Sequence, residues 1–274
     1  MTLRYITTLF FLLTALPTLA ADKIRVAGST TVLPIIAEAA KQYRVLHPDI
    51  LLTVSGGGSG VGVASIDQRS VEIGMASRAL TAQEKQRLKG RVNVVPVARD
   101  AVAVVVSKAV YVAGVTRLSI PQIAAIYRGE INNWQVLGGP DVRILVIDKE
   151  PSRGTRHVFA ETVLGDARAR APGASIITGS NNEEQAAVAN SDQAIGMLSN
   201  AWLNDRVRAV AVGEPDQAVL PTIEHVADGR YPIRRELNIL VPTQADKTVS
   251  AFVDFLLSTQ GQKIVQQVGY LPIR

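Results

Sequence analysis

Hydrophobic and polar positions alternate in blocks along the first hundred residues. Short apolar runs rich in β-branched residues predict buried strands at 23–27, 50–54, 71–76 and 92–97. Segments with apolar residues at helical spacing, or with capping signals, predict helices at 32–46, 63–68 and 81–89. Alternating strands and helices are typical of an α/β domain in which helices flank a mainly parallel sheet.

The same alternation continues through the second half of the chain. Strands are predicted at 100–106, 144–148, 194–198, 207–212 and 237–241, and helices at 121–127, 157–164, 183–190, 222–227 and 249–268. We expect 100–106 to cross into a second lobe, and 237–241 to return and pair with it. The long amphipathic helix at 249–268 should pack back on the first lobe. Lobe one is thus predicted from 21–106 and 220–274, and lobe two from 107–219.

The first twenty residues differ from the remainder. Arg4 is the only charge before Ala21, and the apolar run at 6–16 is too short to span a bilayer comfortably. Small residues at Thr18 and Ala20 suit a signal peptidase. We expect a cleaved signal peptide over 1–20 and a periplasmic protein; an N-terminal membrane anchor is the alternative. The chain has no cysteine, which excludes a lipoprotein signal.

Composition narrows the classes of ligand. The net charge of +5 fits an anionic ligand without requiring one. Aromatic residues make up only 5% and form no stripe with basic residues, so we expect no nucleic-acid partner. The three histidines lie far apart in sequence, without metal-ligand spacing. The sequence therefore predicts no metal and no cofactor.

Candidate chemistry follows the predicted strands. Hydroxyls and glycines occupy 28–31 and 55–62, and Ser77-Arg78 ends the third strand. In sheets of this kind, ligands bind beyond the carboxyl ends of the strands. Glycines before a helix leave N–H groups unpaired, and the helix dipole favours an anion there. The spacing fits neither a P-loop nor a dinucleotide fingerprint, and a flexible surface turn is the alternative for 55–62.

In lobe two, a loop that also follows a predicted strand contains several cationic side chains. Lys149 through Arg156 follow a predicted strand and precede a helix, with Ser152 and Thr155 among them. Arginine in such a loop can bind an oxyanion through two hydrogen bonds. Surface ion pairs are the alternative for Arg78, Arg153 and Arg156.

Read together, these stretches resemble the phosphate-binding proteins of bacterial phosphate ABC transporters. The matching stretches are 28–31, 55–62, 73–78, 100–106, 126–134, 153–156, 194–196 and 252–270. The resemblance implies a two-lobed type II periplasmic-binding-protein fold, with hinge strands and one oxyanion in the cleft. It also implies inorganic phosphate as ligand, delivery to ABC transporter permease subunits, and a monomer.

The resemblance further suggests which residues hold the anion. Carried over position by position, the expected ligand-binding residues are Ser29, Thr30, Thr31, Ser59, Ser77, Arg78, Asp100, Ser152, Arg153, Gly154 and Thr155. Arg153 stands where the family usually has serine, so either Arg153 or Ser152 could face the anion. Arg78 stands where better-known members have the aspartate that accepts the proton of hydrogen phosphate. Asp100, or another carboxylate, would have to replace that acceptor, and Asp100 is the residue we expect.

Three other functions stay open. The same fold could bind another oxyanion, namely sulfate, molybdate or tungstate. It could also serve phosphate sensing or surface attachment rather than import. A hydrolase is disfavoured, because Ser59 lacks the G-x-S-x-G context and no histidine lies in the candidate loops.

Overall fold

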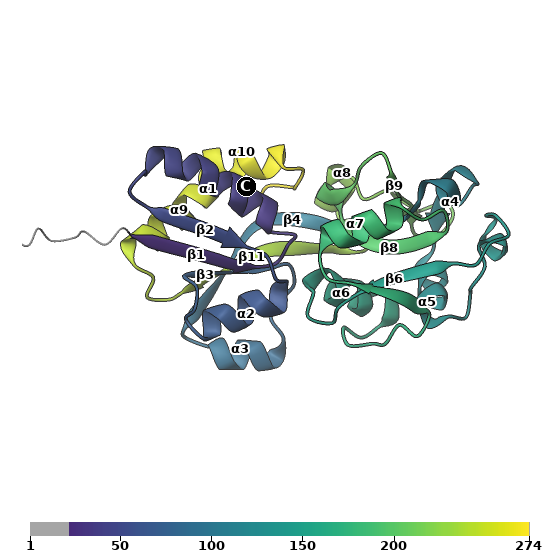
Figure 1. The fold of residues 1–274 in the computed structure, drawn as a ribbon, viewed down its shortest axis with the longest axis horizontal. Helices are drawn as coiled ribbons and strands as arrows, with labels where there is room; N and C mark the ends of the chain where they lie inside the picture. Colours follow the sequence, from purple (N-terminus) through teal and green to yellow (C-terminus); the bar gives the residue numbers. More distant parts are fainter. Residues whose placement is uncertain (1–21, 274) are drawn as a thin grey trace, which may run out of the picture.

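Two lobes joined by two long strands form the architecture, as Figure 1 shows for residues 22–273, the part of the chain that the computed structural model describes. The expected signal peptide over 1–20 lies outside these residues. Both lobes combine a sheet with helices on its two faces, as the alternation of strands and helices predicts. The predicted two-lobed α/β class is confirmed.

Lobe one is built around a parallel sheet. Its elements are β1 (Lys23–Gly28), α1 (Leu33–Leu46), β2 (Leu51–Ser55), α2 (Ser59–Asp67), β3 (Ile73–Ala76), α3 (Ala82–Leu88), α9 (Lys247–Leu257) and α10 (Thr259–Gln267). Strand β1 pairs in parallel with β2 on one edge and β3 on the other. Helices α1, α9 and α10 cover one face of the sheet, and α2 and α3 lie on the other (Figure 1).

Lobe two is likewise built from a sheet flanked by helices. Its helices are α4 (Lys108–Val112), α5 (Ile120–Arg128), α6 (Gly154–Phe159), α7 (Asn181–Ala189) and α8 (Ile223–Ala227), with short 3-10 turns at Trp134–Leu137 and Asn200–Trp202 and a π-helical turn at Ala160–Leu164. Its strands are β5 (Arg117–Leu118), β6 (Leu145–Lys149), β7 (Ala174–Thr178), β8 (Ala194–Ser199), β9 (Val207–Ala209) and β10 (Ala211–Val212). Strand β6 pairs in parallel with β7 and β8.

The two hinge strands are β4 (Val92–Ser107) and β11 (Arg234–Pro242). Residues 92–101 of β4 pair with β11, and Val102–Val106 pair with β8 of lobe two. One sheet therefore runs through both lobes, in the order β2-β1-β3-β11-β4-β8-β6-β7. The parallel strands of the two lobes run toward each other, so that their carboxyl ends meet between the lobes (Figure 1).

Several local predictions change once the strands pair. The strands predicted at 92–97 and 100–106 are one strand, β4, because it passes from one lobe's sheet into the other's. The return strand β11 pairs with residues 92–101 rather than 100–106, since β8 and β9 already pair with the far end of β4. The predicted helix at 249–268 is two helices that meet at Ser258, whose hydroxyl caps α10.

The lobe boundary also differs from the predicted position at residue 220. Val226, Tyr231 and Ile233 are buried in the core of lobe two, together with Trp134 and Tyr127. The chain therefore returns to lobe one at β11, which begins at Arg234 rather than at residue 220. Residues 220–233 carry apolar side chains that lobe two needs to complete its core.

Candidate functional site

A small cavity lies where the carboxyl ends of the strands of the two lobes meet. Its lining residues are Ser29, Thr30, Thr31, Gly58, Ser77, Lys149, Arg153, Gly154, Thr155, Gly179 and Asn181. Every one of them lies in a loop that follows a parallel strand, at such a strand's end, or in the first turn of the helix beyond it. The cavity thus lies where the rule that ligands bind beyond strand ends would place a binding site.

The loop after β1 presents hydroxyl groups to this cavity. Neither Ser29 nor Thr30 caps α1 through its side chain: Val32 is the N-cap residue, and no side-chain capping bond is made there. Instead the carbonyl oxygen of Ser29 accepts the N–H groups of Val32 and Leu33 at 3.1 and 3.0 Å. Its hydroxyl accepts the N–H of Thr31 at 3.2 Å. Backbone groups thus hold the loop and leave the hydroxyl of Thr31 to the cavity.

The glycine loop brings lobe one close to lobe two. Gly57 and Gly58 have φ angles of 141° and 95°, which residues with a Cβ rarely adopt. The N–H of Gly58 donates to the carbonyl of Gly28 at 2.8 Å, and the N–H of Gly60 donates to the carbonyl of Ser152 in lobe two at 3.0 Å. The loop is therefore an ordered contact between the lobes, rather than the flexible surface turn that was its alternative.

Ser59 lies behind the cavity wall. Its hydroxyl accepts the N–H of Ser77 at 3.0 Å and lies 3.3 Å from the Ser77 hydroxyl. Ser77 lines the cavity, whereas Ser59 does not. Ser59 is thus placed to support Ser77 rather than to contact a ligand.

The loop after β6 supplies the facing wall from lobe two. Helix α6 begins at Gly154, where an added Cβ would come within 2.3 Å of the Ser59 hydroxyl and 2.5 Å of the Ser77 hydroxyl. Only glycine lets the two lobes approach this closely. Thr155 lies in the next position, and its hydroxyl is 3.3 Å from that of Thr31.

Arg153, rather than Ser152, lines the cavity. Its Nε and Nη2 atoms donate to the carboxylate of Glu150 at 2.8 and 2.6 Å, and its side chain is 16% exposed. Ser152 contacts lobe one through its backbone carbonyl, which accepts from Gly60. The sequence left open which of these two residues faces the anion. The structure favours Arg153, because Ser152 is not among the residues that line the cavity.

Lys149 and Glu184 form a buried ion pair beside the cavity. Their Nζ and Oε2 atoms are 2.5 Å apart, and the side chains are 2% and 0% exposed. Burial raises the pKa of Glu184, although the ammonium of Lys149 opposes that shift. Lys149 lines the cavity at the end of β6, so it brings a fixed cation there. It was not among the predicted site residues, although its position within the loop after a strand was visible in the sequence.

Asn181 is a second lining residue that the sequence did not reveal as part of the site. Its Nδ2 atom donates to the hydroxyl oxygen of Thr31 at 3.0 Å, across the space between the lobes. It begins α7 after Ser180, which forms a capping box with Glu183. An asparagine at the start of a capped helix is common without any ligand, so no local signal marked it.

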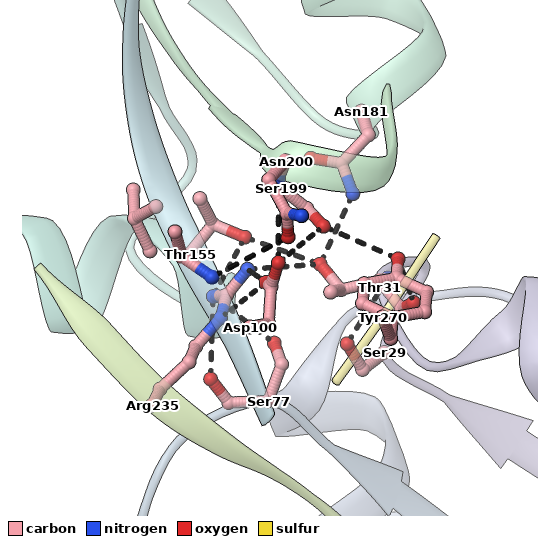
Figure 2. A network of polar contacts seen from close by, with 12 residues as sticks. Ser29, Thr31, Ser77, Asp100, Thr155, Asn181, Ser199, Asn200, Arg235 and Tyr270 are labelled. Carbon is pink, nitrogen blue, oxygen red and sulfur yellow. Dashed lines mark hydrogen bonds and ion pairs between the residues drawn. The ribbon is translucent and has the colours of Figure 1, made fainter. Parts of the chain in front are cut away.

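Arg235 is the most important residue that sequence reasoning missed. It lies on β11 directly opposite Asp100 of β4, and its Nε and Nη2 atoms donate to the Asp100 carboxylate at 2.9 and 2.6 Å. Both side chains are buried, at 3% and 0% exposure. As Figure 2 shows, the guanidinium lies at the centre of a polar network that includes Ser77, Thr31 and Thr155. The only feature of the sequence that could have indicated Arg235 is that it and Arg234 stand together at the start of an apolar strand.

Asp100 lies behind the cavity lining. One carboxylate oxygen accepts from the Ser199 hydroxyl at 3.0 Å and the Asn200 N–H at 3.3 Å, and the other accepts from Arg235. Burial raises the pKa of Asp100, while Arg235 opposes that shift. The geometry does not favour Asp100 as the acceptor of a ligand's proton, because both oxygens already accept from protein donors.

Arg78 points to a different partner from the one expected. Its Nη1 and Nη2 atoms donate to the two carboxylate oxygens of Glu84 at 2.7 and 2.8 Å. Glu84 is also the reciprocal partner of Thr81 in the capping box of α3. Arg78 is 7% exposed and does not line the cavity, so the geometry favours the ion pair over a direct contact with an anion.

Chemically, the cavity is a set of donors balanced by nearby carboxylates. Three cations lie at or beside it, and each is paired with an acid: Lys149 with Glu184, Arg153 with Glu150, and Arg235 with Asp100. Among residues 22–273, no carboxylate and no histidine line the cavity. The described part of the chain also contains no group of three or more potential His, Cys, Asp or Glu metal ligands. Of its helices, none is long and apolar enough to cross a membrane.

Comparisons with known proteins agree with this architecture. The PBP superfamily domain matches residues 14–260. The phosphate-binding protein PstS of Bacillus subtilis is 31% identical over 259 residues, which cover 93% of this chain and 82% of the relative. PstS of Borreliella burgdorferi is 29% identical over 260 residues, covering 92% of this chain and 90% of the relative.

Solved structures give the same result. A phosphate ABC transporter substrate-binding protein from Clostridium perfringens, with bound phosphate, has a TM-score of 0.85 and 31% identity; the match covers 92% of this chain and all of that one. An ABC-type phosphate transport receptor from Vibrio cholerae has a TM-score of 0.74 and 30% identity, with 90% and 99% covered. The chain therefore belongs to the PstS family of phosphate-binding proteins, within the PBP superfamily.

Proposed function

We propose that the protein binds inorganic phosphate in the cavity between its lobes and delivers it to the permease of an ABC transporter. The observation that carries this proposal is the convergence of strand-end loops from both lobes on one cavity of hydroxyls, glycines and cations. The relatives are named for phosphate binding, and one related structure contains bound phosphate. These relatives are binding proteins, which argues against the hydrolase alternative.

The donor set suits a small dianion. An anion that loses its water needs many hydrogen-bond donors in return, because an unpaired buried charge is costly. Hydroxyls and the N–H groups at helix starts supply donors without adding charge. The lining residues Ser29, Thr30, Thr31, Ser77, Lys149, Arg153, Gly154, Thr155 and Asn181 are the proposed contacts. The cavity lining does not include Ser59, Arg78, Asp100 or Ser152, so we propose that these residues affect a ligand only through other residues that they contact.

Sulfate is the second candidate, because the lining residues include no carboxylate. A carboxylate in contact with the ligand would accept the proton of hydrogen phosphate and repel sulfate, which has no proton to donate. Among the lining side chains only neutral acceptors, such as the amide oxygen of Asn181, remain. We therefore expect phosphate to be preferred over sulfate by a smaller ratio than a carboxylate would provide.

Calorimetric titration of the purified protein with phosphate, sulfate and molybdate tests the assignment. We expect one phosphate per chain without added metal, weaker binding of sulfate, and a higher melting temperature in phosphate by mass action. Binding of molybdate without binding of phosphate would replace phosphate by a larger oxyanion. A protein that binds none of the three would overturn the assignment altogether.

The remaining proposals concern where the protein works and in what state. We propose that cleavage after Ala20 releases a monomer into the periplasm, where it meets its permease. The mass of the N-terminal peptide from the periplasmic fraction would report the cleavage site. Light scattering of the same sample would report the oligomeric state, and a membrane-bound, uncleaved chain would contradict the proposal.

A further inference from the structure

We propose that Arg235, held by Asp100, is a positioning residue that orients the cavity hydroxyls as donors toward the anion. The proposal rests on the proposed function, because it concerns the same cavity. Arg235 does not line the cavity, but it donates to the hydroxyls of Thr31 and Thr155, which belong to lining residues. Its effect on a ligand is therefore transmitted through those two hydroxyls.

The orientation of the guanidinium is fixed from behind. Arg235 and Asp100 are register partners on the two hinge strands, and two hydrogen bonds join the guanidinium to one carboxylate oxygen. The other carboxylate oxygen accepts from Ser199 and from the backbone of Asn200. The carboxylate is thus held from lobe two, and the guanidinium nitrogens also contact the hydroxyls of Thr31 and Thr155 (Figure 2).

Those hydrogens reach hydroxyl oxygens of both lobes. Nη1 donates to the Thr155 hydroxyl at 3.0 Å, and Nη2 donates to the Thr31 hydroxyl at 3.3 Å. A guanidinium can only donate hydrogen bonds. Each of the two hydroxyl oxygens must therefore act as acceptor toward Arg235, and each hydroxyl hydrogen must point somewhere else.

A count of hydrogens shows where they can go. The Thr31 oxygen also accepts from the amide of Asn181 at 3.0 Å, so both of its lone pairs are occupied. The hydroxyls of Thr31 and Thr155 are 3.3 Å apart, and only one hydrogen can lie between them. Thr31 must therefore be the donor in that contact, which leaves the hydrogen of Thr155 available to an anion in the cavity. Without Arg235, either hydroxyl could rotate and present a lone pair, which would repel the anion.

The same contacts couple orientation to closure of the lobes. Thr31 belongs to lobe one and Thr155 to lobe two, whereas Arg235 lies on a hinge strand. Both hydroxyls reach the guanidinium only when the lobes are close together. Arg235 is thus placed to orient one donor from each lobe in the closed arrangement alone.

A double-mutant cycle tests this role. The first variant carries Arg235→Gln together with Asp100→Asn, which removes both charges and leaves no buried charge unpaired. The second variant is Thr155→Val, and the third combines all three changes. Calorimetry with phosphate should show affinity about 100-fold weaker for the first variant and about tenfold weaker for the second. The combined variant should fall no more than about threefold below the first, because a hydroxyl without its orienting partner contributes little.

The outcomes separate the two proposals. A combined loss of about 1,000-fold, the product of the separate effects, would show that Arg235 acts independently of Thr155 and overturn the positioning role. A first variant within threefold of the parent would overturn it as well. A parent that does not bind phosphate overturns the proposed function itself, which is a different result.

Arg235→Lys guards against a purely structural effect. Lysine keeps the positive charge, but a single Nζ cannot reach the Asp100 carboxylate and both hydroxyls in the guanidinium's fixed geometry. We expect its melting temperature without phosphate to stay near that of the parent while affinity falls at least about tenfold. Affinity equal to that of the parent would show that charge alone suffices and would contradict the positioning role.

Discussion

The two walls of the cavity are built from different chemistry. Lobe one contributes hydroxyls and glycine through Ser29, Thr30, Thr31, Gly58 and Ser77, and none of these residues is charged. Lobe two contributes the two lining cations, Lys149 and Arg153, together with Gly154, Thr155, Gly179 and Asn181. Neutral donors therefore face charged ones across the space between the lobes.

This difference suggests a division of labour. A neutral wall of oriented donors recognises an oxyanion by the directions of its oxygens, since hydrogen bonds depend on geometry. A wall with buried cations supplies attraction, which falls off slowly with distance. We therefore expect changes in lobe two to alter the strength of binding most, and changes in lobe one to alter discrimination between oxyanions.

The largest expected effect is loss of the buried cation of lobe two. Lys149→Met combined with Glu184→Gln removes the ion pair without leaving a buried charge alone. Phosphate affinity should fall about 100-fold or more, since a charge-assisted hydrogen bond in a dry site is lost. Calorimetry would measure it, with the exposed Lys108→Met in the same lobe as control. Equal affinities of the parent and the double variant would refute the assigned role of lobe two.

Gly154→Ala should have the next largest effect. The new Cβ would meet the hydroxyls of Ser59 and Ser77 at 2.3 and 2.5 Å, so the lobes could not approach as closely. We expect affinity to fall about 30-fold. The melting temperature without ligand should change little, because the contact is between lobes rather than within a core. X-ray scattering with and without phosphate would show whether closure is reduced; an unchanged closure and affinity would contradict the prediction.

Thr31→Val in lobe one should weaken phosphate binding about tenfold, because one oriented donor is lost. The diagnostic quantity is the ratio of phosphate to sulfate affinity, measured on the same sample. We expect this ratio to change more in Thr31→Val than in the variant that lacks Lys149 and Glu184. A larger change of this ratio in the variant that lacks Lys149 and Glu184 would show that lobe one does not determine discrimination between the two oxyanions.

Arg78→Ala should leave phosphate affinity within about threefold of the parent, because the guanidinium is paired with Glu84 and does not line the cavity. The free energy of unfolding should fall by roughly 2–3 kcal/mol, since a largely buried carboxylate loses its partner. Chemical denaturation and calorimetry on the same sample separate the two quantities. A large loss of affinity at unchanged stability would restore Arg78 as a ligand.

The smallest expected effect is on the stability of the fold at acidic pH, through the carboxyl group of Glu84. Burial tends to raise the pKa of Glu84, but hydrogen bonds from Arg78 and Thr81 outweigh it and hold the pKa at about 2, below its usual 4.5. Because the folded pKa is the lower one, the stabilisation is present above pH 4.5 and is lost as the pH falls toward 2. The difference in stability between the parent and Glu84→Gln should shrink across that range. A constant difference would show that the carboxylate is not stabilised in the fold.

Periodic patterns and strand-end chemistry predicted much of this protein. The polar loops after the strands at 23–27, 50–54, 71–76 and 144–148 all contribute residues to the cavity, together with the loop after β7. Of the residues that the family resemblance suggested as ligands, the following line this cavity: Ser29, Thr30, Thr31, Ser77, Arg153, Gly154 and Thr155. Such features are local, because a strand followed by glycine, hydroxyls and a helix start has the same geometry wherever it occurs.

The sequence by itself determined the alternation of strands and helices, the two-lobed class and most of the loops that face the cavity. Only the tertiary structure decided which charges serve that cavity. Arg78 lies directly after a lining serine yet pairs with Glu84, whereas Arg235 is distant in sequence yet contacts hydroxyls of both lobes. The pairing register of the hinge strands places Arg235 opposite Asp100, and hydrogen-bonded register between distant segments is not encoded in the local pattern of either one.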